Sequence, residues 1–154
     1  MSCAPFVQTP VEVAKKMIQL AALKPGQTLY DLGAGDGRLV IMAAQETGAH
    51  TVGVEMREDL VERARSEIKK LNLEERVQMV HGDFFSVDLK DADAVTLYLT
   101  TSGNERLRPK LEQELKKGAK VISHDFKVGN WKPSVVYNEL LGHTIYSYDV
   151  GQQL

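Results

Sequence analysis

The chain has 154 residues, 43% of them apolar, which is enough for one globular domain (residues 1–154) with a buried core and too little for a second domain. Its formal net charge is −2 and its lysines are scattered rather than gathered in a basic stripe, so nucleic acid is a disfavoured partner. No apolar run is long enough to cross a bilayer, no signal peptide is recognisable, and the single cysteine, Cys3, excludes an intramolecular disulfide, so we expect an unprocessed, soluble, cytoplasmic protein.

The order of hydrophobic patterns predicts an α/β fold with one doubly wound, mostly parallel seven-stranded sheet and an antiparallel C-terminal hairpin. Thr9, Pro10 and Glu12 have the pattern of an N-cap, a proline at the first helical position and a capping-box acid, so the first helix is expected to run from there to about Leu23. Further helices are expected at residues 38–47 and 59–71. The expected strands are residues 28–32, 51–55, 77–81, 94–99, 120–124, 135–140 and 144–150.

One more helix is expected between the fourth and fifth strands. Its main part should begin at Pro109, because a proline inside a helix removes a hydrogen bond and crowds the preceding turn. Gly118 is expected to end it. Lys116 and Lys117 would then lie in the last turn, where cations suit the helix dipole.

A glycine-rich turn follows the first strand in the stretch LYDLGAGDG, residues 29–37. Glycine tolerates positive φ and lets a ligand lie against bare backbone, so a turn with Gly33, Gly35 and Gly37 is suited to hold a ligand closely. Its spacing differs from the G-x-G-x-x-G of dinucleotide-binding proteins, and no Lys-Ser or Lys-Thr pair completes a P-loop. With Asp31 ahead of the glycines, the stretch resembles motif I of the class I, seven-stranded methyltransferases, which bind S-adenosylmethionine (SAM).

Carboxylates also stand at the ends of the second and third expected strands. In open α/β sheets, ligands bind beyond the carboxyl ends of the strands, where the strand order reverses. Glu55 is placed to accept hydrogen bonds from both ribose hydroxyls, the alternative being a solvated strand end. Asp83, in HGDFF, is placed to accept from an adenine amino group, although Gly-Asp is also an ordinary turn. Together with the glycine turn, these residues predict an adenosine site.

The ends of the fourth and fifth strands carry Tyr98, His124 and Asp125. His124 either faces the site or bonds a neighbouring loop, and Tyr98 and Trp131 either line a pocket or belong to the core. His143 is expected to be structural or exposed. No metal site is expected, because the histidines lack ligand spacing and there is no cysteine cluster. Methyl transfer from SAM needs none, since the sulfonium is already activated and the enzyme must only align the acceptor and exclude water.

Several longer stretches carry a narrower resemblance. They are FVQTP (6–10), LYDLGAGDGRLVI (29–41), VGVE (52–55), GDFFSVDL (82–89), VTLYL (95–99), NERLRPKL (104–111), and VISHDF with the following NWKP (121–133). Together they resemble the small archaeal protein lysine methyltransferases of broad specificity. They are similar also to the mitochondrial enzymes that methylate a lysine of the ATP synthase c subunit or of the adenine nucleotide translocase.

This resemblance implies methyl transfer from SAM to the ε-amino group of lysine in protein substrates, with S-adenosylhomocysteine as the product. It implies that the N-terminal segment, residues 1–10, folds over the cofactor, and that the acceptor lysine enters near residues 98–104 and 123–133. The catalytic residues are expected among Tyr98, His124 and Asp125, with the proton acceptor open among these and water. The expected SAM-binding residues are Thr9, Pro10, Asp31, Gly33, Ala34, Gly35, Glu55, Met56, Gly82, Asp83, Phe84 and Leu97.

The sequence departs from these relatives in its leader, where they often read Y-V-P-T-P and this chain has Phe6-Val7-Gln8-Thr9-Pro10. A missing hydroxyl there could alter acceptor choice or rate. One alternative function is a small-molecule or RNA methyltransferase, against which stand the absent basic stripe and the absence of [ND]-P-P-[YF] at residues 97–100. Another is a non-catalytic SAM- or dinucleotide-binding module. Lysine is favoured because no cap domain remains to enclose a small substrate, and because burial beside a sulfonium lowers the amine pKa from about 10.4.

Overall fold

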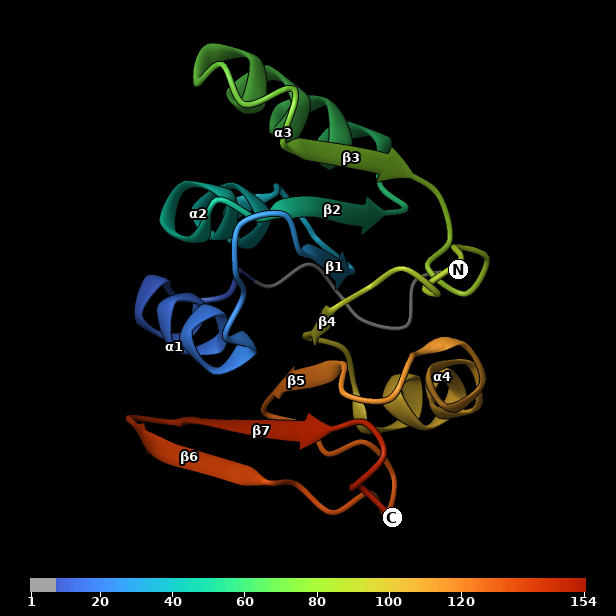
Figure 1. Cartoon of the computed structure of the whole chain (residues 1–154). Helices are drawn as coiled ribbons and strands as arrows, with labels where there is room; N and C mark the ends of the chain where they lie inside the picture. The colour runs from blue at the N-terminus through green and yellow to red at the C-terminus, as the bar shows by residue number, and fades with distance from the viewer. Residues whose placement is uncertain (1–7) are drawn as a thin grey trace.

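The computed structural model describes residues 8–154, so Cys3, Phe6 and the rest of residues 1–7 lie outside the described part. Four helices and seven strands alternate along that part (Figure 1). Their bounds are α1 Val11–Ala21, β1 Thr28–Leu32, α2 Arg38–Thr47, β2 His50–Glu55, α3 Glu58–Lys70, β3 Val77–His81, β4 Ala94–Leu97, α4 Thr101–Glu114, β5 Lys120–His124, β6 Val135–Leu140 and β7 His143–Asp149. No helix among residues 8–154 combines the length and the apolar character that a membrane span requires.

The strands form one sheet in the order β3-β2-β1-β4-β5-β7-β6. The first five strands in sequence pair in parallel, and β7 pairs antiparallel with both β5 and β6. This confirms the predicted doubly wound sheet with an antiparallel C-terminal hairpin. The order reverses between β1 and β4, so the loops after these two strands diverge and leave a crevice between them.

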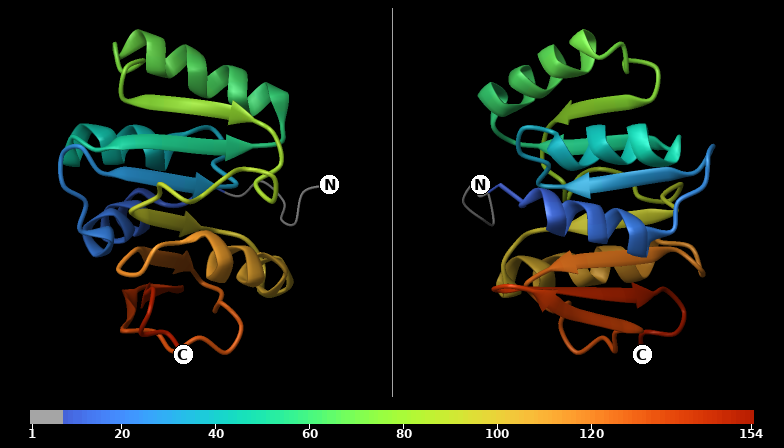
Figure 2. Two further views of the ribbon diagram at one scale, coloured as in Figure 1. Left: turned by 45° about the vertical axis from the view of Figure 1, so that its right-hand side comes forward. Right: turned by 90° about the vertical axis from the view of Figure 1, so that its left-hand side faces the viewer.

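Helices cover the two faces of the sheet unequally. The right-hand view of Figure 2 shows α1, α2 and α3 side by side on one face, with α4 behind the sheet. On the α4 face, the segment that joins β3 to β4 also packs against the sheet, through Phe84, Leu89 and Ala92. These residues form one core cluster with Leu107 and Leu111 of α4. Buried on both faces, β4 is entirely apolar apart from one threonine, as the centre of a parallel sheet requires.

The start of α1 differs from the prediction. Pro10, with φ −57° and ψ 150°, is the N-cap, and no side chain caps the helix, so the predicted cap by Thr9 is wrong. The carbonyl of Thr9 instead accepts a hydrogen bond from Arg38 Nη1 at 3.2 Å. At the other end, Ala22 adopts a left-handed conformation with φ 50°, which ends the helix at Ala21.

The region from β4 to α4 also differs. The fourth strand ends at Leu97, because α4 begins at Thr101 and Thr100 caps it by accepting from the Gly103 N–H at 3.0 Å. The prediction that Pro109 begins the helix is therefore wrong: Pro109 lies inside α4, which buried residues on either side of it hold against the core. The predicted end at Gly118 is wrong as well, since α4 ends at Glu114 and extended backbone follows.

Candidate functional site

A pocket opens at the carboxyl ends of β1, β2 and β4, where the strand order reverses. The space between its walls is about 800 Å³ when the open mouth is included. Among the residues predicted for the site, those that line this pocket are Thr9, Asp31, Gly33, Ala34, Gly35, Glu55, Met56, Phe84, Leu97 and Tyr98. Those that do not line it are Pro10, Gly82, Asp83, His124 and Asp125.

The glycine turn forms one wall of the pocket. Gly33, Gly35 and Gly37 all have positive φ, of 80°, 60° and 82°, a conformation that other residues adopt at a cost. A side chain at Gly37 would also place its Cβ 2.9 Å from the Cβ of Ala64 in α3. The turn is therefore fixed by backbone conformation and by close helix packing together.

Asp31 lies at the floor of the pocket with only 7% of its surface exposed. Its Oδ1 accepts a hydrogen bond from the Thr96 hydroxyl at 2.8 Å. Burial raises the pKa of Asp31 to about 7, and the nearby charge of Glu55 raises it further while the Thr96 bond opposes the shift. A cation bound in the pocket would place a positive charge beside this carboxylate and so favour its ionised form.

Glu55, at the end of β2, turns back toward the glycine turn. Its Oε1 accepts from the Gly35 N–H at 2.8 Å and its Oε2 accepts from the Arg57 N–H at 3.0 Å. The side chain thus holds the turn in place and also lines the pocket. Glu55 is therefore not simply a solvated residue at a strand end. Each carboxylate oxygen keeps a second lone pair for a ligand hydroxyl.

The segment after β3 contributes through Phe84 rather than Asp83. Phe84 is buried and lines the pocket, and its ring lies 4.7 Å from that of Phe85, centroid to centroid. Asp83 accepts from the Phe85 N–H at 2.9 Å with Oδ1, so it forms the turn that positions Phe84.

The described part of the N-terminal segment reaches the pocket and the glycine turn. Gln8 and Thr9 line the pocket. The Gln8 side-chain amide donates to Asp36 Oδ2 at 3.2 Å, and the Thr9 carbonyl accepts from Arg38. Residues 8 and 9 are therefore tied to the start of α2 by two hydrogen bonds.

Tyr98 forms the pocket wall on the side of β4 and β5. Its ring packs on that of His124, with centroids 3.9 Å apart and ring planes inclined by 31°. Burial raises the pKa of Tyr98, and the charge of Asp125 adds to this. Burial lowers the pKa of His124 to about 4, against the opposing charge of Asp125. Both rings are therefore neutral near pH 7.

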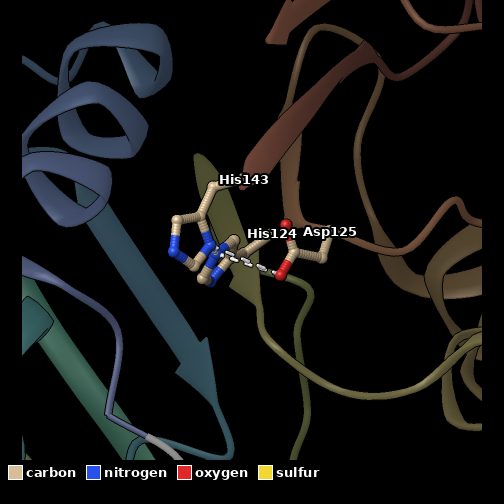
Figure 3. A group of neighbouring side chains, drawn as sticks. All are labelled: His124, Asp125 and His143. Atoms are coloured by element: carbon tan, nitrogen blue, oxygen red, sulfur yellow. Dashed lines mark hydrogen bonds and ion pairs between the residues drawn. The ribbon is translucent and has the colours of Figure 1, made fainter. Parts of the chain in front are cut away.

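His124 and Asp125 meet His143, which the β5–β7 pairing brings to the same end of the sheet (Figure 3). His124 Nε2 and His143 Nδ1 are 2.8 Å apart. Asp125 Oδ2 lies 3.4 Å from the first nitrogen and 3.5 Å from the second. The expectation that His143 is structural or exposed missed this cluster, because it depends on strand register rather than on sequence spacing.

Sequence reasoning also missed several pocket residues. They are Gln8, Met17, Asp36, Arg38, Leu39, Arg57 and Leu99. Asp36 and Arg38 flank the last glycine of the turn, so position in the motif was an available signal, whereas Met17 reaches the pocket from α1 and carries no local signal. Trp131 belongs to the core and donates to Glu112 at 2.8 Å, and Asn104 is fully buried with its amide on the carbonyls of Phe126 and Lys127.

The strand order and the pocket at its reversal point are those of the Rossmann-like class I methyltransferase fold, and comparison with known proteins makes the chain a SAM-dependent methyltransferase. The family described as ANTKMT methyltransferase domain matches residues 31–135, which include the glycine turn, Glu55 and β5. The chain belongs to this family.

Individual relatives agree with that assignment. A protein-lysine N-methyltransferase of Saccharolobus islandicus is 40% identical over 96% of this chain and 94% of its own length. The mouse adenine nucleotide translocase lysine N-methyltransferase is 32% identical over 95% of this chain, which spans 63% of that protein. Among solved structures, an RNA methyltransferase of Salinibacter ruber in complex with S-adenosylhomocysteine is 43% identical, with a TM-score of 0.90 and 94% of each chain covered.

Proposed function

We propose that this protein transfers a methyl group from SAM to the ε-amino group of lysine in other proteins. The observation that supports lysine as the methyl acceptor is the 40% identity, over nearly the full length of both chains, to a protein-lysine N-methyltransferase. The geometry supports it through a pocket whose acceptor wall, Tyr98 on His124, is aromatic and neutral.

The donor side of the pocket fits SAM. Its buried acid, Asp31, suits the positively charged methionine end of the molecule, and Glu55 suits the ribose. Gly33, Ala34, Gly35, Met56, Phe84 and Leu97 supply backbone and apolar surface between them. SAM supplies an activated methyl group on its sulfonium. We assign the adjoining roles to Thr9, which lines the pocket, with Pro10 next to it in the chain, and to Gly82 and Asp83, which form the turn before Phe84.

The acceptor side must receive an uncharged amine, because a protonated lysine has no lone pair for the methyl group. A lysine that enters between the pocket mouth and Tyr98 leaves water and approaches a sulfonium, and both effects lower its pKa from about 10.4. Tyr98 is a neutral phenol whose oxygen can accept a hydrogen bond from the amine and orient its lone pair. His124 positions the Tyr98 ring by stacking, and Asp125 holds the far side of His124.

The direct test is transfer of labelled methyl groups to lysate proteins. We infer a cytoplasmic location from the single cysteine, so cytoplasmic extract is the first source of substrate. The chain and methyl-labelled SAM are added to extract, and labelled peptides are mapped. Label on lysine is expected, and it should be lost with Glu55→Ala but kept with Glu58→Ala, a change at an exposed glutamate of α3. Binding of SAM without any transfer would favour the non-catalytic alternative.

RNA is the second candidate substrate, and the specific observation that favours it is the Salinibacter ruber structure, which is described as an RNA methyltransferase. The net charge of −2 argues against it, because affinity for a phosphate backbone depends on basic residues. Treating the labelled extract separately with protease and ribonuclease distinguishes the two. Label that ribonuclease releases, and protease does not, would overturn the lysine proposal.

A further inference from the structure

The cluster of His124, Asp125 and His143 is a distinct feature beyond the SAM pocket, and none of its three residues lines that pocket. Two imidazoles and one carboxylate each turn a single ligand atom toward the others (Figure 3). The three separations are 2.8, 3.4 and 3.5 Å. We propose that His124 Nε2, His143 Nδ1 and Asp125 Oδ2 form a binding site for one divalent first-row transition-metal ion.

The two nitrogen–oxygen separations, 3.4 and 3.5 Å, match those between ligands of a tetrahedral ion, and the 2.8 Å between the two nitrogens would have to open by roughly 0.5 Å on binding. Three atoms at these distances leave a point about 2.0 to 2.1 Å from each, which is the usual length of a bond from zinc to imidazole nitrogen or carboxylate oxygen. Two imidazoles and a carboxylate are ligands of zinc, iron and their neighbours, whereas magnesium and calcium prefer sites made of oxygen atoms. The donor set therefore favours zinc or a related ion over the hard cations.

The carboxylate is held in place by bonds of its own. The Asp125 N–H donates to the Thr144 carbonyl at 2.7 Å, and Asp125 Oδ1 accepts from the Thr144 N–H at 3.0 Å. Asp125 also has a φ of 68°, a conformation that is uncommon outside glycine. With Oδ1 occupied by Thr144, the other oxygen is the one that faces both histidines. Such anchoring of a ligand is typical of built metal sites.

The site has a closed side and an open side. The His124 side chain is completely buried, while the side chains of His143 and Asp125 are 28% and 25% exposed. An ion can enter from the solvent side and keep water as its remaining ligand. His124 Nδ1 is buried without a hydrogen-bond partner. With Nε2 on the metal, the proton on Nδ1 would have no acceptor, so we expect an affinity for the ion about 10- to 100-fold lower than at a site where that N–H is hydrogen-bonded.

A hydrogen bond between the two imidazoles also accounts for the shortest of the three distances. In that reading His124 Nε2–H donates to His143 Nδ1 and no ion is required. The two readings differ in what removal of His143 does to metal binding. Because that measurement uses no methyl transfer, its outcome is independent of the proposed function.

The experiment is calorimetric titration of the full chain with zinc sulfate, in a Cys3→Ser background that removes the only thiol. One ion per chain is expected, with affinity reduced at least about 30-fold by His143→Ala and about 10-fold by Asp125→Asn. His50→Ala, at an exposed histidine far along the sheet, is the matched control and should leave the affinity unchanged. Melting temperatures of all variants show that they fold, and His124 is left unchanged because it is buried.

Two results would overturn the proposal. One is no binding by the folded chain at zinc concentrations up to about 100 μM, an affinity too weak for a specific site. The other is binding that His143→Ala leaves unaltered, which would place the ion elsewhere. Anomalous diffraction from zinc-loaded crystals tests the proposal by locating the ion. An ion between the three side chains supports the site, and an ion in any other place contradicts it.

Discussion

The ends of β1 and β5 both carry chemistry at the same edge of the sheet, and they are built in opposite ways. At the ends of β1 and β2, the acidic side chains are held by groups of the fold: Asp31 by the Thr96 hydroxyl and Glu55 by the backbone of Gly35 and Arg57. At the end of β5, His124, Asp125 and His143 contact one another as well as groups of the fold, since Asp125 bonds to Thr144 and His124 packs on Tyr98. The β1 end binds its ligand through groups that the backbone and Thr96 hold in place, whereas the β5 end gathers three side chains around the proposed metal position.

This difference leads to distinct expectations for variants. Changes at the β1 end should alter the binding of SAM or the stability of the empty protein. Changes at the β5 end should alter the transfer rate while SAM binding stays intact. The expected effects below run from the largest to the smallest.

The largest effect concerns Asp31 and the stability of the protein without ligand. Its folded-state pKa, about 7, lies above the ordinary pKa of an aspartate, 3.8, so the folded state holds the proton more tightly and stability falls as pH rises between these values. Asp31→Asn removes this loss of stability at high pH, because asparagine does not ionise. The difference in unfolding free energy between variant and wild type should grow by on the order of 3 kcal/mol from pH 4 to pH 8 in urea titrations. Asp91→Asn, at an exposed site, should show no such trend, and a flat difference for Asp31→Asn would contradict the prediction.

The next effect is on the affinity for SAM. Glu55→Ala removes both a ligand contact and the bond that holds the Gly35 N–H, and the expected loss is about 1.5 to 3 kcal/mol, as for hydrogen bonds to charged groups. Calorimetric titration with SAM measures it, and Glu58→Ala serves as the control on the exposed start of α3. An unchanged dissociation constant would show that Glu55 only shapes the turn.

A smaller effect is the pH dependence of SAM affinity. With a pKa of about 7, Asp31 is almost wholly protonated at pH 5.5 and half ionised at pH 7, and only the ionised form attracts a cation. Affinity for SAM should therefore rise about tenfold over this interval, in which an ordinary α-amino group stays protonated. Asp31→Asn should bind SAM weakly at both pH values. A wild-type affinity that is constant with pH would place the cation away from Asp31.

An effect of similar size is expected on the acceptor side. Tyr98→Phe keeps the ring that packs on His124 and removes only the oxygen that orients the amine. The transfer rate at saturating SAM should fall about tenfold, or about 1.4 kcal/mol, while the dissociation constant for SAM changes by less than about twofold. Parallel losses in rate and in SAM affinity would mean that the two regions do not act separately.

The sheet and the glycine turn were predictable because their signals are local. The alternation of strands and helices appears directly in the hydrophobic pattern, and the conformation of residues 33–37 depends on glycine itself. Helix α4 was misplaced because its boundaries depend on other forces. A cap at Thr100 and buried leucines on both sides of Pro109 outweigh the cost of the proline.

The candidate site divides in the same way. Asp31 and Glu55 lie at the ends of strands and Phe84 follows one, so all three could be predicted from the sequence as pocket residues. The meeting of His124 with His143 could not, because it depends on the antiparallel register in which His124 lies opposite Ile145. No short-range sequence pattern predicts a contact between residues that are 19 positions apart.

The attachment of residues 8 and 9 to the start of α2 bears on how fast the enzyme can turn over. Among the described residues 8–154, two side-chain hydrogen bonds, from Gln8 to Asp36 and from Arg38 to Thr9, hold residues 8 and 9 at the start of α2. At about 1 kcal/mol each, they make the release of these residues cost about 2 kcal/mol. Residues 8 and 9 can therefore be released without unfolding any helix or strand, and their release alone would not limit the exit of S-adenosylhomocysteine.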